Sequence, residues 1–309
     1  MPMNRVLIVD KPQGMTSHDV VVRLRRSSGI RKIGHSGTLD PAATGVMLVL
    51  VGRATKIARF LVELEKEYRG HMILGRTTDT QDAAGRVTGE RDASGVTREQ
   101  VEAAFARFVG EIEQVPPMVS AVKHEGTPLY VLARKGVEVE RKPRTVTIER
   151  LRLLGFEPPR VAFGVVCSKG TYVRTLAADV GEVLGCGAHL GGLERVRVGE
   201  FGVGDARPLE ELEELGKDVG EVGLSMYEAL SAFPLVALEP DERDTVTTGG
   251  SIVVDVDRVP PGDVGYVRLT AGTDEELVAV GECGLSPDGS GERTVRPVRV
   301  FAEPFGVGE

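Results

Sequence analysis

Cysteine is scarce in this chain of 309 residues. Its three cysteines, Cys167, Cys186 and Cys283, are odd in number and widely spaced, with no C-x-x-C pair and no pair of histidines nearby. Disulfide frameworks and zinc sites both rest on closely patterned cysteines. The sequence therefore favours neither, and we expect three ordinary thiols, buried or half-buried.

Long apolar runs are also absent. The longest unbroken aliphatic run, Val46–Val51, is far too short to cross a bilayer. The N-terminal residues, MPMNRVLIVDKP, lack the long apolar segment of a signal peptide. We therefore expect a cytoplasmic protein with no membrane partner. The hydrophobic content of 41% is enough for a sizeable core, and the length favours one large domain plus a small one.

Positive charge is in deficit overall, with 38 basic residues against 46 acidic ones, but the balance changes along the chain. Residues 201–309 contain 8 basic and 23 acidic side chains, whereas the first 60 residues contain 10 basic and 3 acidic ones. A basic front and an acidic tail indicate a polyanion-facing surface in one part of the molecule. A charged face that only aids solubility is the alternative.

Hydrophobic periodicity predicts alternating strands and helices over the first 200 residues. A Thr16–Asp19 capping box is expected at the start of the first helix, and another cap at the start of the helix over 97–110. Strands are predicted over 5–10, 46–52, 68–75 and 161–170, and helices over 20–29, 53–65, 97–110 and 171–185.

Two further regions differ in composition. Residues 117–145, "PPMVSAVKHEGTPLYVLARKGVEVERKPR", are rich in turns and positive charge, which is typical of a mobile, substrate-facing insertion. From Phe233 onward the chain is predicted to be strand and turn, with Pro and Gly punctuation. We expect a domain over 1–232 and a second over 233–309.

One carboxylate occurs in an unusual setting. Residues 34–55, "GHSGTLDPAATGVMLVLVGRAT", place Asp40 among small residues directly before the most apolar run of the chain. Pro41 steers Asp40 away from helical dihedrals, and the small neighbours leave space around its side chain. Such a turn presents the carboxylate; an Asx turn, in which Asp40 binds its own backbone, is the alternative.

The same stretch resembles the central motif of the TruB family of pseudouridine synthases, G-H-x-G-x-L-D-P-x-A-T-G followed by a strand and G-x-A-T-K. Residues 34–56 carry every fixed position of that motif. Further blocks of the chain also match the family in the right order, and together they cover most of residues 6–200. One precedes the motif, "DKPQGMTSHDVV". The others follow it: "EKEYRG", "RTTDTQDAAG", "PPMVSAVKHEGTPLYVLARKG", "CSKGTYVRTLAADVGEVLGCGAHL" and "LERVRV". Several ordered blocks are far more specific than a single motif.

The resemblance implies an α+β (mixed α/β) catalytic domain on a long, mostly antiparallel sheet flanked by helices, followed by a small β-rich, PUA-like domain. It also implies a tRNA pseudouridine-55 synthase, which detaches one T-loop uracil from its ribose, turns it and rejoins it through carbon. Such chemistry needs an ionised carboxylate, either as a nucleophile or as a base. Asp40 matches that group, and Arg174 matches the arginine that pairs with it.

The remaining site residues follow from the same resemblance. Tyr68 matches a tyrosine that stacks on the target base and is a candidate for the proton step at carbon five. Four further residues match family positions that line or flank the uracil pocket: His35, Tyr172, Leu193 and Asp82. For Asp82, a simple role in capping a turn is the alternative. Lys11, Lys56, Lys123 and Arg195 are predicted to contact the RNA backbone, since phosphate contacts set register.

No metal or organic cofactor is expected, because the reaction is redox-neutral and the uracil itself returns as the reagent. We expect the T arm of tRNA as partner, gripped by the 117–145 insertion, and a monomer without an obligatory protein partner. Because its charge is negative, the tail is expected to add little RNA binding. A guide-RNA-dependent synthase, a non-catalytic RNA-folding protein and, more remotely, a glycoside hydrolase are the alternatives.

Overall fold

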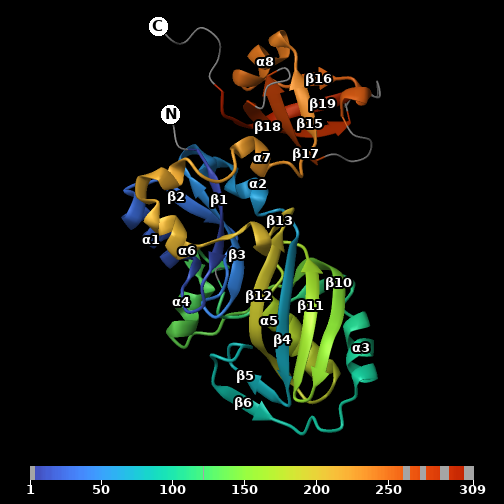
Figure 1. The fold of residues 1–309 in the computed structure, drawn as a ribbon. Coiled ribbons are helices and arrows are strands. Elements are labelled where there is room, and N and C mark those ends of the chain that lie inside the picture. Colours follow the sequence, from blue (N-terminus) through green and yellow to red (C-terminus); the bar gives the residue numbers. More distant parts are fainter. Residues whose placement is uncertain (1–3, 121, 260–264, 272–275, 286–291, 303–309) are drawn as a thin grey trace.

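The computed structural model describes residues 4–120, 122–259, 265–271, 276–285 and 292–302 (Figure 1). A ten-stranded sheet runs in the order β14-β1-β3-β12-β4-β11-β10-β7, with β2 paired to β3 and β13 to β12. Its pairs are antiparallel except for β1 with β14 and β3 with β12. The predicted mixed α/β class with a long, mostly antiparallel sheet is therefore confirmed.

The elements have the following bounds. The strands of the long sheet are β1 (Val6–Lys11), β2 (Ile33–Ser36), β3 (Thr44–Val51), β4 (Lys66–Leu74), β7 (Gly110–Gln114), β10 (Arg144–Glu157), β11 (Arg160–Cys167), β12 (Ala188–Val198), β13 (Phe201–Gly202) and β14 (Arg207–Pro208). Two short hairpins are β5 (Arg76–Thr78) with β6 (Val87–Glu90), and β8 (Lys123–His124) with β9 (Thr127–Pro128).

The helices are α1 (Ser17–Ser28), α2 (Ala58–Leu61), α3 (Arg98–Ala106), α4 (Leu129–Arg134), α5 (Val173–Val183), α6 (Leu209–Glu214), α7 (Met226–Ala229) and α8 (Pro240–Thr247). Short 3-10 segments are η1 (Gly52–Ile57), η2 (Val203–Asp205), η3 (Gly216–Gly220) and η4 (Val256–Arg258). No helix in the described parts of the chain has the length and apolar character to cross a membrane.

Local signals position the first elements as expected. The Thr16 hydroxyl accepts from the Asp19 amide at 3.1 Å, and the Asp19 carboxylate accepts from the Thr16 amide at 2.9 Å, so the predicted capping box is present. Gly29 ends α1 with a φ of 73°. The predicted apolar strand is β3, which is buried from Gly45 to Val51 because it lies in the middle of the sheet.

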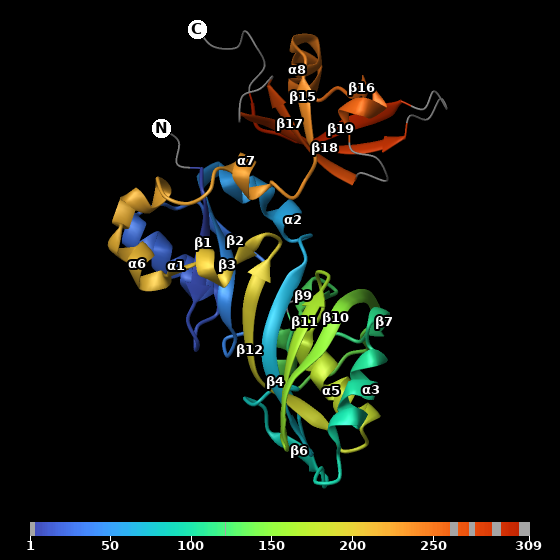
Figure 2. The same cartoon turned by 45° about the vertical axis from the view of Figure 1, so that its right-hand side comes forward.

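Helices cover both faces of the sheet (Figure 2). Alternate residues of a strand point to opposite faces, so Met47 and Val49 of β3 pack with α1 and α6, whereas Leu48 and Leu50 pack with Phe60 of α2. At the other end of the sheet, α3 and α5 pack on β4, β10, β11 and β12. Between these two packed regions, loop 37–43 meets β4 and the start of α5, and a site can form there.

The helix predicted over 53–65 is shorter and split. The chain forms η1 and then the single turn α2, which ends at Leu61. The Lys66 ammonium donates to the carbonyls of Val62 and Leu64, both at 2.5 Å, and so satisfies carbonyls that follow the helix end. The chain can therefore turn and enter β4, which confirms the strand predicted there.

The basic insertion over 117–145 contains the β8–β9 hairpin and α4. It is tied to the main body by the guanidinium of Arg174, which donates to the Val119 carbonyl at 2.9 Å. Its predicted role in gripping RNA stays a prediction.

The C-terminal region forms the five-stranded sheet β15-β17-β18-β19-β16, with bounds Leu235–Leu238, Gly265–Ala271, Leu277–Leu285, Arg293–Val300 and Ile252–Val254. The β-rich C-terminal region expected from the sequence is confirmed, and it also contains a helix that was not predicted, α8. Its signals are Pro240 in the first turn and a Glu242 carboxylate that accepts from the Glu239 amide at 2.8 Å. Phe60 and Tyr266 pack edge to face at 5.0 Å, so this sheet shares a core with α2.

Candidate active site

A cavity of about 500 Å³ opens between loop 37–40, the start of α5 and strands β4, β10 and β12. Six residues singled out from the sequence line it: Asp40, Tyr68, Tyr172, Arg174, Leu193 and Arg195. They come from segments more than 150 residues apart, which the sheet order brings together. The site thus depends on the whole topology of the long sheet.

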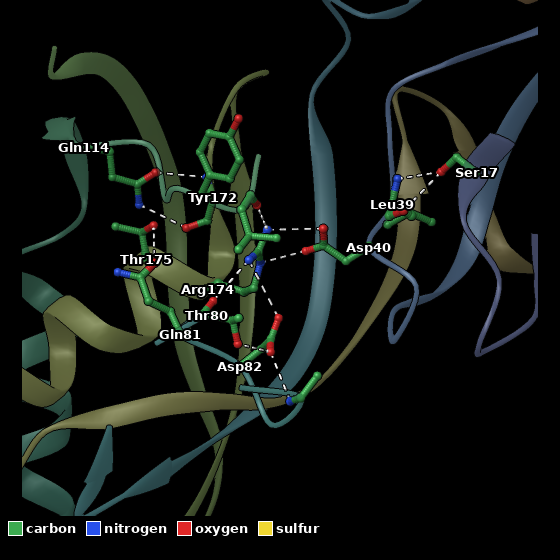
Figure 3. Close-up of polar contacts among 12 residues, drawn as sticks. Ser17, Leu39, Asp40, Thr80, Gln81, Asp82, Gln114, Tyr172, Arg174 and Thr175 are labelled. Carbon is green, nitrogen blue, oxygen red and sulfur yellow. Dashed lines mark hydrogen bonds and ion pairs between the residues drawn. The ribbon is translucent and has the colours of Figure 1, made fainter. Parts of the chain in front are cut away.

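The loop that carries Asp40 is held by a side chain on α1. The Ser17 hydroxyl accepts from the Leu39 amide at 2.8 Å and donates to the Leu39 carbonyl at 3.2 Å, as Figure 3 shows. The Ala43 amide donates to the Asp40 carbonyl at 3.0 Å and closes the turn. These hydrogen bonds hold the backbone of the turn, so the Asp40 carboxylate is not used to close the turn and points away from it.

Gly45 explains one of the glycines of the motif. It has a φ of 94°, and a Cβ at this position would lie 2.3 Å from the carbonyl oxygen of Arg195. At Gly45, β3 and β12 pair in parallel with Arg195 as its partner. Only glycine permits both the dihedral and this close approach of the two strands.

The Asp40 carboxylate faces Arg174 (Figure 3). Arg174 Nε lies 2.8 Å from Asp40 Oδ2, and Arg174 Nη2 donates to Asp40 Oδ1 at 3.2 Å. The Arg174 side chain is 4% exposed and that of Asp40 is 41% exposed. A fork of two bonds therefore fixes the direction of a carboxylate that remains open to a ligand.

Arg174 is itself held from behind. Besides its bond to Val119, it donates to the Thr80 carbonyl at 3.1 Å, and its Nη1 lies 3.7 Å from Asp82 Oδ2. Asp82 also accepts from the Thr80 hydroxyl at 2.6 Å and from the Ala84 amide at 3.0 Å. Asp82 is thus both a turn residue and a second carboxylate beside the guanidinium, which combines the two predicted roles.

The start of α5 is fixed by a buried glutamine. The Gln114 side chain accepts from the Tyr172 amide at 2.9 Å and donates to the Tyr172 carbonyl at 3.2 Å (Figure 3). Gln114 is 2% exposed. Since the Tyr172 amide belongs to the helix start, this pair sets the position of Arg174 two residues later.

Tyr68 lies on β4 directly opposite Arg195 on β12. Burial raises the pKa of the Tyr68 hydroxyl, and the positive charge of the Arg195 guanidinium opposes that shift. The phenol therefore remains protonated near neutral pH and lines the same cavity as Asp40. A carboxylate and a phenol that share one cavity can act on opposite parts of a bound ring.

The structure corrects two of the predicted phosphate contacts. Lys11 is 0% exposed and Arg195 is 1% exposed. Lys11 Nζ donates to the carbonyls of Pro12 at 2.9 Å and Ala43 at 2.7 Å. Arg195 Nε donates to the Val46 carbonyl at 2.7 Å. Both cations are buried and donate to backbone carbonyls around the Asp40 loop, which does not support their predicted role as phosphate contacts.

The other predicted residues lie apart from the cavity lining. His35 is on β2; burial lowers its pKa, and its Nδ1 is a buried atom without a hydrogen-bond partner in the described chain. Lys56 lies in η1, at the far end of β3. Lys123 lies in β8 of the insertion. The structure therefore brings neither Lys56 nor His35 to the carboxylate.

Sequence reasoning missed three polar residues at the site: Ser17, Gln114 and Lys66. Ser17 and Gln114 act through backbone groups distant in sequence, and no local pattern announces such bonds. Lys66 lies between the predicted helix over 53–65 and the predicted strand over 68–75, so neither pattern marked it. It lines the cavity, and burial lowers its pKa to about 8. The described residues contain no group of His, Cys, Asp and Glu that could hold a metal ion.

The chain matches two family models. Residues 25–173 match the TruB family pseudouridylate synthase N-terminal domain, and residues 174–222 match the tRNA pseudouridylate synthase B C-terminal domain. The tRNA pseudouridine synthase B of Syntrophotalea carbinolica is 52% identical over 77% of this chain and 78% of its own. The protein of the same name from Pelotomaculum thermopropionicum is 42% identical over 98% of this chain and 99% of its own.

A solved structure is also similar. In the crystal structure of a Cbf5–Nop10–Gar1 complex, the matching chain has a TM-score of 0.74 and is 26% identical over 97% of this chain and 85% of that chain. The similarity therefore includes both the long sheet and the five-stranded sheet.

Proposed function

Because this chain belongs to the TruB family of pseudouridylate synthases, we propose that it converts uridine 55 in the T loop of tRNA to pseudouridine. The enzyme is an isomerase, as the curated relatives' shared name, tRNA pseudouridine synthase B, indicates. We place the reaction in the cytoplasm, on the unmodified tRNA.

One observation carries the assignment of the site. The Asp40 carboxylate is open to the cavity while its partner Arg174 is buried and held by backbone carbonyls. A ligand can therefore reach an ionised acid whose direction does not depend on the ligand. Such pre-organisation is what a nucleophile or a base needs at a sugar carbon.

The reaction proceeds without net gain or loss of atoms. The bond between N1 of uracil and C1′ of ribose breaks with Asp40 acting on the ribose or base, either by attack or by removal of a ribose proton. In the first case the bond to Asp40 breaks again before the product forms, and in the second case Asp40 returns the proton to the ribose. The base turns within the cavity, a bond forms between C5 and C1′, a proton leaves C5 and N1 ends protonated. The Tyr68 hydroxyl, beside the base, is the group assigned to the C5 proton: its oxygen accepts that proton while its own proton passes on to N1 or to solvent.

The test compares wild type with Asp40→Asn on a T-arm stem-loop, with pseudouridine detected by nucleoside chromatography after complete digestion. The amide keeps the shape of the turn and removes the charge. We expect the single-turnover rate to fall by roughly three orders of magnitude or more, with RNA binding retained. An unchanged rate would remove Asp40 from the mechanism and favour a non-catalytic RNA-folding role.

A second function is favoured by one observation, the similarity to the Cbf5 chain of the Cbf5–Nop10–Gar1 complex. A chain of that kind would act only together with a guide RNA and partner proteins. The same stem-loop assay separates the two, because the purified chain is expected to modify the naked T arm. Conversion that appears only after a guide RNA and partners are added would favour the second function.

A further inference from the structure

Four cations gather where the long sheet meets the C-terminal sheet, and they form what we call the junction cluster: Lys32, Arg53, Lys56 and Arg299. They come from three separate places: the residue before β2, the η1 segment and strand β19. Lys32 and Arg299 are exposed, and Arg53 and Lys56 are half-buried.

Backbone contacts hold the members of the cluster side by side. The Gly52 amide donates to the Lys32 carbonyl at 2.8 Å, which sets Lys32 beside Arg53. The Arg53 guanidinium donates to the Phe301 carbonyl, two residues after Arg299. The shared core of Phe60 and Tyr266 fixes the two sheets against each other. The cluster is therefore built by the junction and does not depend on a flexible tail.

The charges of the cluster are uncompensated. None of its four members takes part in a salt bridge within the described residues. Burial and then the charges of Arg53, Arg299 and Lys32 lower the pKa of Lys56, so the four cations repel one another. In a chain with 46 acidic residues, such a group without carboxylate partners is a place for an anion from outside.

The cluster lies well away from the catalytic cavity. Strand β3 runs from Thr44, four residues after Asp40, to Val51, immediately before η1. Eight strand residues at about 3.3 Å each span roughly 25 Å. None of the four residues lines the cavity. A ligand that reaches both places must be long as well as anionic.

We propose that the junction cluster binds backbone phosphates of the tRNA outside its T loop, as a second contact zone about one strand length from the target uridine. This inference rests on the proposed function and assigns Lys56, which the sequence placed at the RNA backbone, to a zone separate from the cavity. It also gives the acidic C-terminal region one defined contact with RNA, through Arg299.

The test uses the triple variant Lys32→Gln, Lys56→Gln, Arg299→Gln; Arg53 is kept because its bond to Phe301 joins the sheets. The matched control, Arg107→Gln, Arg152→Gln, Lys217→Gln, removes three exposed charges elsewhere. Binding is measured in an Asp40→Asn background, over a range of salt concentrations, to a full-length tRNA transcript and to the isolated T-arm stem-loop.

For the cluster variant we expect tRNA affinity at low salt to fall about tenfold or more, and the slope of log affinity against log salt to decrease by about two to three. Stem-loop affinity should stay within about twofold. Equal tRNA affinity in the cluster and control variants would overturn the proposal, as would an equal loss for tRNA and stem-loop. Conversion of the stem-loop by the wild-type chain tests the proposed function independently of either result.

Discussion

The two ends of β3 use positive charge in different ways. At the end beside the Asp40 loop, Lys11 and Arg195 are buried and donate to backbone carbonyls. At the opposite end, Lys56 and the other members of the junction cluster are exposed or half-buried and take part in no salt bridge in the described chain. The eight residues of β3 thus join a region where cations hold the backbone to a region where cations can accept a ligand.

The difference separates two kinds of basic residue that look alike in the sequence. A buried cation whose donors are used on carbonyls fixes the local backbone, and its loss should change the rate of the chemical step. An exposed cation without a partner can bind phosphate, and its loss should change affinity and salt dependence. Variants at the two ends of β3 should therefore differ in which quantity they change.

Among the variants at cations, the largest effect is expected from Arg174→Met, whose guanidinium pairs with the Asp40 carboxylate. It removes both bonds to the carboxylate and leaves the carbonyls of Thr80 and Val119 without their donor. We expect the single-turnover rate on the T-arm stem-loop to fall roughly 10²- to 10³-fold. The free energy of unfolding should decrease by about 1–3 kcal/mol, measured by urea titration.

Arg174→Lys is the matched control, because it keeps the charge and loses the fork. Compared with Arg174→Met, we expect Arg174→Lys to regain more of the lost stability than of the lost rate, because one ammonium cannot make both bonds to Asp40. Equal rates for wild type and both variants would mean that the observed ion pair does not orient the carboxylate during the reaction.

Much of the fold could be predicted from local signals. The Thr16–Asp19 and Thr97–Gln100 capping boxes and the apolar run of β3 are short-range patterns, and each gives the expected element. The failures at α2 and α8 also involve local contacts, which the hydrophobic periodicity did not reveal. The Lys66 ammonium satisfies carbonyls after α2 and so permits an early end to the helix, whereas α8 is capped by glutamates in a region dominated by strands.

The residues of the site also divide into those that the sequence could predict and those that it could not. Resemblance to a family motif led to Asp40, Arg174 and Tyr68, because motif positions carry over residue by residue. The sequence could not show that Lys11 and Arg195 are buried, since a lysine or arginine has the same letter inside and outside. It also gave no signal for Ser17 and Gln114, whose partners are backbone groups that only the folded chain brings near.

A smaller effect is expected from Arg195→Lys, which tests the buried end of β3 directly. The guanidinium donates to the Val46 carbonyl at 2.7 Å and to the Gly37 carbonyl at 3.4 Å, and its charge acts on the Tyr68 hydroxyl, whose pKa it lowers. A lysine cannot reach all three, so the Asp40 loop and Tyr68 lose their common support. We expect the single-turnover rate to fall about 10- to 100-fold, with RNA affinity within about twofold.

The opposite pattern would break the comparison. If Arg195→Lys lowers RNA affinity and the salt slope while the rate on bound RNA is unchanged, Arg195 is a phosphate contact after all. Circular dichroism and a melting curve would show that the variant is folded. Lys56→Gln, at the other end of β3, gives the reference for a change in affinity alone.

The smallest effect on the rate is expected from Lys11→Met, whose main effect is on how stability depends on pH. Burial lowers the pKa of Lys11 to about 8; the Arg195 charge adds to this shift and the Asp40 charge opposes it. In the unfolded chain the lysine keeps an ordinary pKa near 10.4. Between these values the unfolded state binds more protons, so this lysine makes stability rise with pH, by at most about 1.4 kcal/mol per pH unit.

The methionine variant has no such group, so its unfolding free energy, measured by urea titration from pH 7 to 10, should rise less steeply than that of wild type. Below pH 8 the buried charge is present in wild type and absent in the variant. Removing a buried charge with a side chain of similar length is often neutral or stabilising, so we expect no large loss of stability at pH 7. Parallel curves for the two proteins would mean that Lys11 is hydrated in solution, and the contrast between the two ends of β3 would then rest on Arg195 alone.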